Sequence, residues 1–344
     1  MIRPRGRYII FFATASFVIL FIPVSRYVRE SLHDVGIIPR SVHPHDITVV
    51  TMYVNIGGFL KGGGNNYFTP ATYLKWMTTW GWLTNRVVAF FDSDEDLETF
   101  RQIRSLQPQD RTVLIKLQRS EIPAFRHLDK IRTIYRNASY PKHTPNTVYA
   151  EYSCAMNAKY DALQMAIQRG LVYTDHLAWL DIGLFRNLLQ TNLRPKEDRF
   201  SLEVPENFNS STVGMSEIAH RQDVSKLSPW DYIRDNRVWV SGAFALATKE
   251  TMWTFSESYK LTLKQLLDEG LSSTDQQVIG AMYSPRFIKR QQVQIATYRC
   301  HDGQFGLYSG DVAFFCLGYI CKDAAEKRLN ASRTERMNSL NHRH

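Results

Sequence analysis

One carboxylate, Asp181, stands in a sequence that is typical of a ligand site. It ends the short apolar run Leu177–Asp181 and is followed two residues later by Gly183. In an open α/β sheet, ligands bind at the carboxyl ends of the strands. A carboxylate there can hold a divalent cation, and a glycine lets a phosphate or a sugar approach the backbone. We therefore predict Asp181 as a catalytic or metal-binding residue, with Mn²⁺ or Mg²⁺ as the cation. The alternative is that Asp181 caps the turn that follows.

A second set of carboxylates begins at Asp92, directly after the apolar run Arg86–Phe91. Asp92-Ser-Asp94 has the spacing of two carboxylates that often share Mg²⁺ or Mn²⁺ on a loop at the end of a strand. The same residues are explained if Asp94 caps a helix, and we favour that interpretation.

Two further polar residues are candidates for binding. Lys159, on a helix predicted over Ala150–Arg169, is a candidate phosphate contact, although a single helical lysine is more often solvated. Asp275, within the capping-box sequence Ser273–Gln276, is a candidate for binding an acceptor hydroxyl, and a capping role explains it equally well. The glycines at 62–64 lack the Lys-Ser/Thr pair of a phosphate-binding P-loop, so we interpret them as a flexible loop.

The elements that must position these residues alternate between strands and helices. The predicted strands are Ile47–Val54, Arg86–Phe91, Thr112–Leu117, Leu177–Asp181 and Val238–Leu246; the predicted helices follow Thr69-Pro70 and cover Asp94–Arg104, Ala150–Arg169, Lys249–Glu269 and Ser273–Tyr283. Near-continuous apolar strands that alternate with helices are typical of a mostly parallel sheet covered on both faces. We predict a three-layer α/β domain, and a long polar excursion over residues 199–228.

The N-terminus is predicted to anchor the chain in a membrane. Residues 8–24 carry no charge and follow Arg3, Arg5 and Arg7, which is the pattern of a membrane segment with a positive cytoplasmic flank. A cleaved signal peptide is the alternative, but the Ala13-Thr-Ala15 triplet lies inside the apolar run rather than after it. We expect a cytoplasmic tail over residues 1–7, a stem over 25–45, a luminal domain over 46–322 and a polar C-terminal tail over 323–344.

Three other observations agree with a luminal body in the Golgi or the ER. Asn137, Asn209 and Asn330 each begin an Asn-x-Ser glycosylation triplet. The four cysteines are an even number, and a disulfide is predicted among the three near the C-terminus, Cys300, Cys316 and Cys321. The net charge of +9 suits an anionic substrate or a membrane surface. No nucleic-acid-binding motif accompanies it, so we expect no nucleic acid as a partner.

Several short motifs, taken in their order along the chain, resemble the HtrL/YibB family. They are Phe91-Asp92, Asn157–Tyr160, Trp179–Gly183, Ser241–Phe244 and Asp275–Val278. The resemblance implies a relative of the nucleotide-sugar glycosyltransferases, with a GT-A-like, mostly parallel central sheet flanked by helices. It places Asp181 at the strand end where those enzymes carry a metal-binding Asp-x-Asp motif. In this chain Gly183 replaces the second carboxylate of that motif.

The resemblance leads us to expect a single-pass type II membrane glycosyltransferase. It would move a sugar from a nucleotide-sugar donor to a glycan or glycoprotein acceptor in the secretory pathway. The expected roles are catalysis for Asp181 and Asp275, metal binding for Asp181, donor binding for Asp92, Lys159 and Gly183, and acceptor binding for Gly242 and Phe244. One alternative is an inactive relative that binds glycans or a partner, which the missing second carboxylate favours. The other is a scaffold for luminal enzymes.

Overall fold

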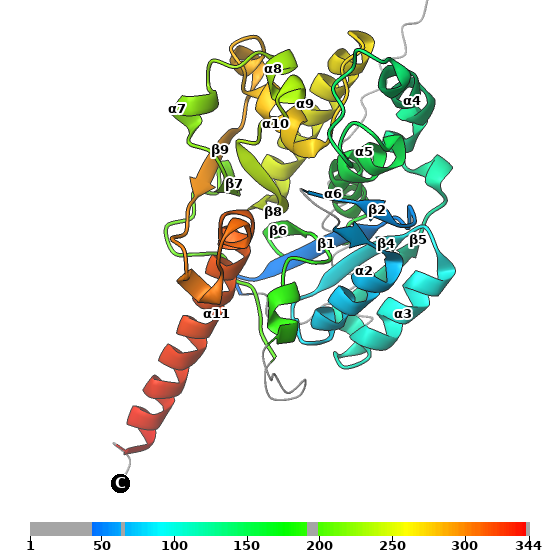
Figure 1. Ribbon diagram of the computed structural model, residues 1–344. Coiled ribbons are helices and arrows are strands. Elements are labelled where there is room, and N and C mark those ends of the chain that lie inside the picture. Colours follow the sequence, from blue (N-terminus) through cyan, green and yellow to red (C-terminus); the bar gives the residue numbers. More distant parts are fainter. Residues whose placement is uncertain (1–42, 63–65, 191–198, 342–344) are drawn as a thin grey trace, which may run out of the picture. The chain divides into compact units, whose positions relative to one another are not determined.

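The computed structural model describes residues 43–62, 66–190 and 199–341 (Figure 1). The predicted cytoplasmic tail, the predicted membrane anchor and nearly all of the predicted stem lie outside the described residues. Within those described residues, no helix is both long enough and apolar enough to cross a membrane.

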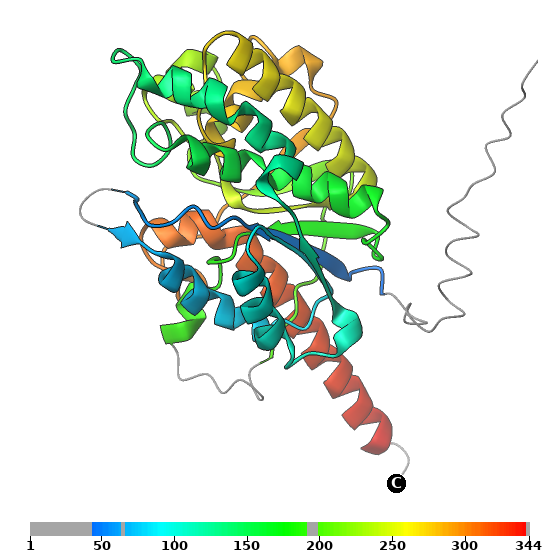
Figure 2. The ribbon, with the colours of Figure 1, turned by 90° about the vertical axis from the view of Figure 1, so that its right-hand side faces the viewer.

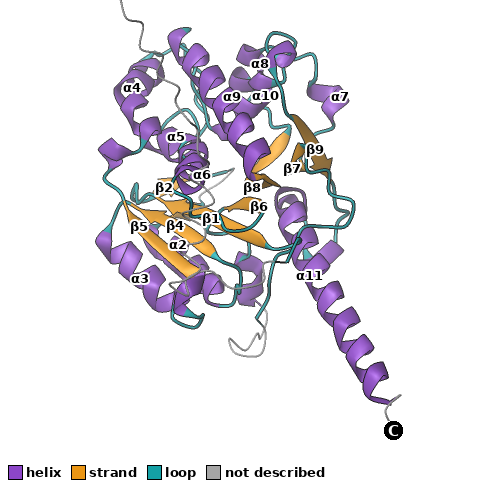
Figure 3. Cartoon of the chain, turned by 180° about the vertical axis from the view of Figure 1, so that it is seen from behind, coloured by secondary structure: helices purple, strands orange, loops and turns teal. Residues whose placement is uncertain are grey.

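A seven-stranded sheet forms the centre of the described body, in the order β5-β4-β1-β6-β8-β7-β9 (Figure 3). Its strands are β1 (Ile47–Tyr53), β4 (Val87–Phe91), β5 (Thr112–Lys116), β6 (His176–Leu180), β7 (Thr212–Glu217), β8 (Val240–Thr248) and β9 (Gln294–Tyr298). Strands β5, β4, β1 and β6 are parallel, β8 is antiparallel to β6 and β7, and β9 is parallel to β7. The predicted mostly parallel α/β sheet is confirmed, and the strand direction reverses between β6 and β8.

Helices cover both faces of this sheet, as Figure 2 shows. They are α2 (Pro70–Met77), α3 (Asp94–Arg104), α4 (Leu128–Arg136), α5 (Ala150–Asn157), α6 (Lys159–Gln168), α7 (Arg221–Val224), α8 (Pro229–Arg234), α9 (Lys249–Asp268), α10 (Asp275–Met282) and α11 (Gly310–Asn341). One hydrophobic cluster joins the sheet to α4, α5, α6, α9 and α10, and the other joins it to α2, α3 and α11. Every residue of β1 and of β4 is buried. This explains why these strands are apolar runs rather than alternating sequences.

Three predicted segments differ from the structure. Residues 323–341 of the predicted C-terminal tail belong to helix α11. The single helix predicted over Ala150–Arg169 is divided into α5 and α6 at Ala158. The predicted polar excursion contains β7, whose pattern is hard to recognise because Gly214 and Ser216 are buried with the apolar residues. Helix α11 packs closely there: a Cβ on Gly214 would lie 3.1 Å from Leu317, and the Leu317 amide donates to the Ser216 hydroxyl at 3.0 Å.

A buried arginine joins α3 to the neighbouring loop and to β5. The side chain of Arg104 is almost fully buried. Its donors are used by the Trp80 carbonyl (2.8 Å), the Leu83 carbonyl, the Asn85 carbonyl (3.1 Å) and the Thr112 hydroxyl (2.8 Å). A guanidinium can satisfy this many acceptors because it has five N–H donors in a fixed plane.

We predict that Arg104→Leu lowers the free energy of unfolding by about 3 kcal/mol or more, because it leaves several buried carbonyls without a donor. The measurement is urea unfolding of the full chain, followed by tryptophan fluorescence. Arg101→Leu, on the same helix, is the control because that side chain is exposed and pairs only with exposed Glu98 among the described residues. If both variants lost the same free energy of unfolding, the buried hydrogen bonds of Arg104 would not be the cause of the loss.

Candidate active site

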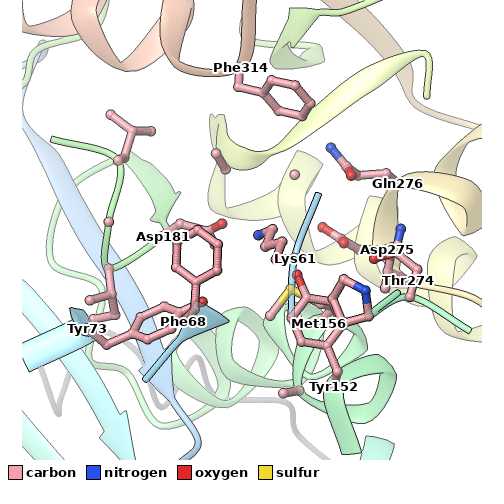
Figure 4. Close-up of a pocket in the computed structure, with 18 of the residues that line it drawn as sticks. Lys61, Phe68, Tyr73, Tyr152, Met156, Asp181, Thr274, Asp275, Gln276 and Phe314 are labelled. Atoms are coloured by element: carbon pink, nitrogen blue, oxygen red, sulfur yellow. The ribbon is translucent and has the colours of Figure 1, made fainter. Parts of the chain in front are cut away.

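A cavity of about 490 Å³ lies at the carboxyl ends of β1 and β6. Cavities of roughly 300–1,000 Å³ are typical of sites for small ligands. Its walls come from the β2–β3 hairpin (Phe59–Leu60 and Tyr67–Phe68), from α2 and α5, and from the first residues of α10 and α11 (Figure 4). The cavity is therefore at the edge of the sheet where the sequence predicted a ligand.

At the wall of this cavity, the ammonium of Lys159 lies between two carboxylates. Its Nζ is 3.1 Å from Asp181 Oδ1 and 3.0 Å from Asp275 Oδ2, and it donates to the Gly242 carbonyl at 2.8 Å. The side chains of Lys159 and Asp275 are each 3% exposed, whereas that of Asp181 is 35% exposed. An ammonium has three donors, and three acceptors surround this one. The interpretation of Lys159 as a solvated helical lysine is therefore wrong.

Burial and charge act in opposite directions on this lysine. Burial alone would lower the pKa of Lys159, but the attraction of Asp181 and Asp275 outweighs it and raises the pKa above its ordinary value. Burial raises the pKa of Asp275, the charge of Asp181 adds to that rise, and Lys159 opposes it. Lys159 is therefore charged at neutral pH, and the group is net negative when both carboxylates are ionised.

The sheet and its neighbours set the direction of the Asp181 side chain. Leu180 pairs with Phe244 of β8, and the Asp181 amide then donates to the Ala243 carbonyl at 2.9 Å. The indole of Trp179, on the strand itself, donates to Asp181 Oδ1 at 2.7 Å. The carboxylate is thus held by Trp179 and Lys159 while part of it stays open to the cavity.

Two glycines are required by close packing around this group. A Cβ on Gly242 would lie 1.9 Å from Asp275 Oδ2 and 3.2 Å from Lys159 Nζ. A Cβ on Gly183 would lie 2.5 Å from the ring of Trp76. Both glycines line the cavity. Gly242 allows the ion pair to approach β8, and Gly183 allows the indole of Trp76 to form part of the wall.

Most of the predicted site residues are brought together here. Those that line the cavity are Lys159, Asp181, Gly183, Gly242 and Asp275. Phe244 does not: it is fully buried in the hydrophobic cluster that faces α2, α3 and α11.

Asp92 is also absent from the cavity wall, although it directly follows β4 at the same edge of the sheet. Its carboxylate pairs with Arg119 at 2.7 Å and accepts the amide of Asn55 at 2.9 Å. The helix cap that we assigned to Asp94 is made by Ser93, whose hydroxyl accepts from the Asp96 amide. The structure therefore gives the first carboxylate of this motif a partner outside the cavity.

Sequence reasoning missed the basic part of the wall and most of its aromatic part. From the sequence, Trp76 is a candidate for stacking on a sugar ring, but its helical spacing with Trp80 favours a core residue, and the structure places Trp76 on the wall. The aromatic residues include Phe59, Phe68, Tyr73, Trp76 and Tyr152, and the basic residues besides Lys159 are Lys61 and Arg186. Phe59 and Phe68 face each other across the hairpin, with ring centroids 6.3 Å apart. The available signal was a pair of aromatic residues on either side of the glycines at 62–64, which is typical of a hairpin.

The described residues do not fit the predicted Mn²⁺ or Mg²⁺. Nowhere in residues 43–62, 66–190 and 199–341 do three or more His, Cys, Asp or Glu side chains gather in a way that would hold a metal ion. A divalent cation shared by Asp181 and Asp275 would have to lie where the Lys159 ammonium lies. The prediction of Asp181 as a metal ligand is thus not supported, because an internal cation takes that position.

Comparison with known proteins places the chain in a family. The model of the HtrL_YibB family, described as "Bacterial protein of unknown function", matches residues 45–293. The chain belongs to the HtrL/YibB family. Among solved structures, apo xyloside xylosyltransferase 1 from mouse is similar at 12% identity and a TM-score of 0.37, over 78% of this chain and 93% of that one. No curated protein sequence matches the chain. Membership of the HtrL/YibB family assigns no activity, so the function has to be argued from the site.

We predict that Lys159→Met in this HtrL/YibB protein lowers the free energy of unfolding by about 3 kcal/mol or more at pH 7, because Asp275 stays buried without its cation. The loss should shrink as the pH falls towards 5. Burial raises the pKa of folded Asp275 above its unfolded value, so the folded variant binds the proton more tightly and loses stability as the pH rises.

Urea unfolding at several pH values measures both effects. Lys264→Met is the control, since Lys264 is 68% exposed and pairs with half-exposed Asp268. The double variant Lys159→Met/Asp275→Asn should recover part of the stability at pH 7. A loss that does not change with pH would show that Asp275 is not the group left unpaired.

Proposed function

We propose that this protein is a glycosyltransferase that moves a sugar from a nucleotide-sugar donor to a hydroxyl of a glycan or glycoprotein acceptor. The observation that carries the proposal is the pair of carboxylates, Asp181 and Asp275, fixed on either side of Lys159 at the wall of an aromatic-lined cavity. Oriented carboxylates, a partly enclosed space of nucleotide-sugar size and flat apolar surfaces for sugar rings meet the needs of this reaction.

The exposed carboxylate is the one that contacts the acceptor. Asp181 is 35% exposed, whereas Asp275 is almost fully buried. In the proposed step the proton of the acceptor hydroxyl passes to Asp181, and the acceptor oxygen forms a bond to the anomeric carbon. The bond from that carbon to the diphosphate breaks, and the nucleoside diphosphate leaves with the electron pair. Lys159 holds the Asp181 carboxylate in place through their ion pair, and Asp275 is among the groups that raise the pKa of Lys159.

The aromatic wall supports a sugar nucleotide as the ligand. Tyr73 and Trp76 lie on α2 with ring centroids 5.0 Å apart, and Phe68 lies 5.5 Å from Trp76. Tyr152 packs edge-on against Phe59 across the cavity wall. Such rings present apolar faces on which the C–H face of a sugar or the plane of a base can stack.

The second carboxylate also bears on the alternative of an inactive relative. That alternative was favoured because Gly183 replaces the second residue of an Asp-x-Asp motif. In the structure Asp275, at the start of α10, supplies a second carboxylate from a distant part of the chain. The missing residue in the strand-end motif is therefore a weaker argument for inactivity than it is in the sequence alone.

Purified full-length protein should release nucleotide or transfer sugar from at least one donor in a panel of UDP-, GDP- and CMP-sugars. Asp181→Asn should lower kcat by about 100-fold or more, since the amide cannot accept the acceptor proton. Asp94→Asn is the control, because Asp94 is 87% exposed and pairs with Lys116 away from the cavity. The absence of both transfer and hydrolysis with every donor, with and without Mn²⁺, would rule the proposal out and favour the inactive relative. An unchanged kcat in Asp181→Asn would remove Asp181 from the proposed catalytic step.

We also propose that the body lies in the lumen of the secretory pathway, anchored by residues 8–24. Cys300 and Cys316 form a disulfide, which agrees with an oxidising compartment, while Cys154 and Cys321 are free and buried. Two of the glycosylation triplets, at Asn137 and Asn209, are exposed in loops, whereas Asn330 lies on α11.

Expression in a eukaryotic secretory cell should yield a protein with two N-linked glycans, because acceptor triplets on surface loops are the accessible ones. Glycosidase digestion should increase its mobility on a gel in two steps. Asn137→Gln and Asn209→Gln should each remove one step, and Asn330→Gln should remove none. If glycosidase treatment did not change the mobility of the protein, this would argue against a luminal body.

A further inference from the structure

The charges of the cavity are divided between an acidic group and two separate basic side chains. The acidic group is Asp181 and Asp275 with Lys159 between them. The basic side chains are Lys61, which follows β2, and Arg186, which follows the turn after β6. The charge of Lys159 is already paired with two carboxylates, and its ammonium also donates to the Gly242 carbonyl, so we look to the other basic side chains for an anionic ligand.

Lys61 lies on an aromatic surface and has no acidic partner among the residues that the structure describes. Its ammonium is 5.7 Å from the ring centroid of Tyr152, and the side chain reaches the cavity (Figure 4). Its backbone amide is fixed by the Asn66 carbonyl at 3.0 Å, within the hairpin. Its full charge is therefore available to a ligand.

Arg186 is held in place from two sides, and among the described residues Asp311 is the only acceptor of its side-chain donors. Its guanidinium lies 5.2 Å from the Trp76 ring and 4.6 Å from the Phe315 ring. One nitrogen, Nη2, donates to Asp311 at 2.5 Å. A guanidinium carries five donors, so the others can bind phosphate oxygens in the paired geometry that arginine favours.

Both basic groups act on the same part of the cavity as Asp181. Tyr73 lies in this region, and burial is the main cause that raises the pKa of its hydroxyl. The charges of Lys61 and Arg186 lower that pKa, and the charge of Asp181 raises it. One phenol thus lies within electrostatic reach of both cations and of the exposed carboxylate.

We propose that Lys61 and Arg186 bind the diphosphate of the donor directly, and that the protein needs no divalent metal ion for binding or transfer. This inference rests on the proposed glycosyltransferase function. A diphosphate next to Asp181 and Asp275 needs positive charge, which in many sites of this chemistry comes from a bound cation. Here Lys159 takes the position between the carboxylates that such an ion would need, so the compensating charge comes from Lys61 and Arg186.

The first experiment measures binding of uridine diphosphate, guanosine diphosphate and inorganic pyrophosphate to the full-length protein by titration calorimetry. Each titration is made once with excess EDTA and once with MnCl₂. The dissociation constant of the bound nucleotide should differ by less than about twofold between the two conditions. The rate of sugar transfer from the active donor of the nucleotide-sugar panel should likewise be nearly the same with EDTA as with MnCl₂.

The second experiment assigns the binding to its residues. Arg186→Met and Lys61→Met should each raise the dissociation constant about tenfold or more, because each removes a charge-assisted contact to the phosphates. Asp311→Asn should lower it, since the change removes a negative charge and frees Arg186. Tighter binding cannot result from misfolding, so this variant keeps the test valid if the others are unstable. Lys75→Met, an exposed lysine of α2 outside the cavity, is the control for net charge.

The outcomes separate this inference from the proposed function. Binding and transfer that appear only with Mn²⁺ would overturn the inference and leave the glycosyltransferase function standing. EDTA-tolerant binding that is unchanged in Arg186→Met, Lys61→Met and Asp311→Asn would overturn the residue assignment. No binding of either nucleotide in either condition, together with no transfer, would overturn both.

Discussion

A buried ammonium that needs two carboxylates is the interaction on which the described site depends. Burying Lys159 in a medium of low dielectric is costly unless opposite charges lie against it. Asp181 meets that need from the end of β6 and Asp275 from the start of α10. Gly242 must stay without a side chain so that these groups can approach β8. The lysine at the start of α6 therefore joins three elements at the point where the strand direction reverses.

The sequence was sufficient for the elements that depend on local pattern, and insufficient for contacts between distant segments. The apolar runs of β1, β4 and β6 predicted a parallel sheet, and the place of Asp181 after β6 followed from that topology. No local pattern shows that Lys159 and Asp275 meet, because only the packing of α6 and α10 around β8 brings them together. Asp92 illustrates the same difficulty: its position after β4 was predicted correctly, but its partner Arg119 is supplied by a later loop.

Two carboxylates meet at this site from distant positions in the chain. The resemblance to glycosyltransferases led us to look for two carboxylates separated by one residue. In this chain the second position is Gly183, and a larger residue there would collide with Trp76. The wall of the cavity thus depends on the absence of that side chain, while Asp275 brings a carboxylate to the same space from another element. A search for the motif alone would miss this arrangement.

The disulfide between Cys300 and Cys316 makes the wall of the cavity sensitive to the redox conditions around the protein. Cys316 lies on α11, and the first two turns of that helix bring Asp311, Phe314 and Phe315 to the cavity wall. The bond ties this part of the helix to the end of β9. In a reducing environment the same wall would be held by non-covalent contacts alone, among them the Leu317–Ser216 hydrogen bond and the Arg186–Asp311 ion pair. The redox state around the chain therefore influences how firmly its ligand cavity is shaped, even though neither sulfur atom belongs to a residue that lines it.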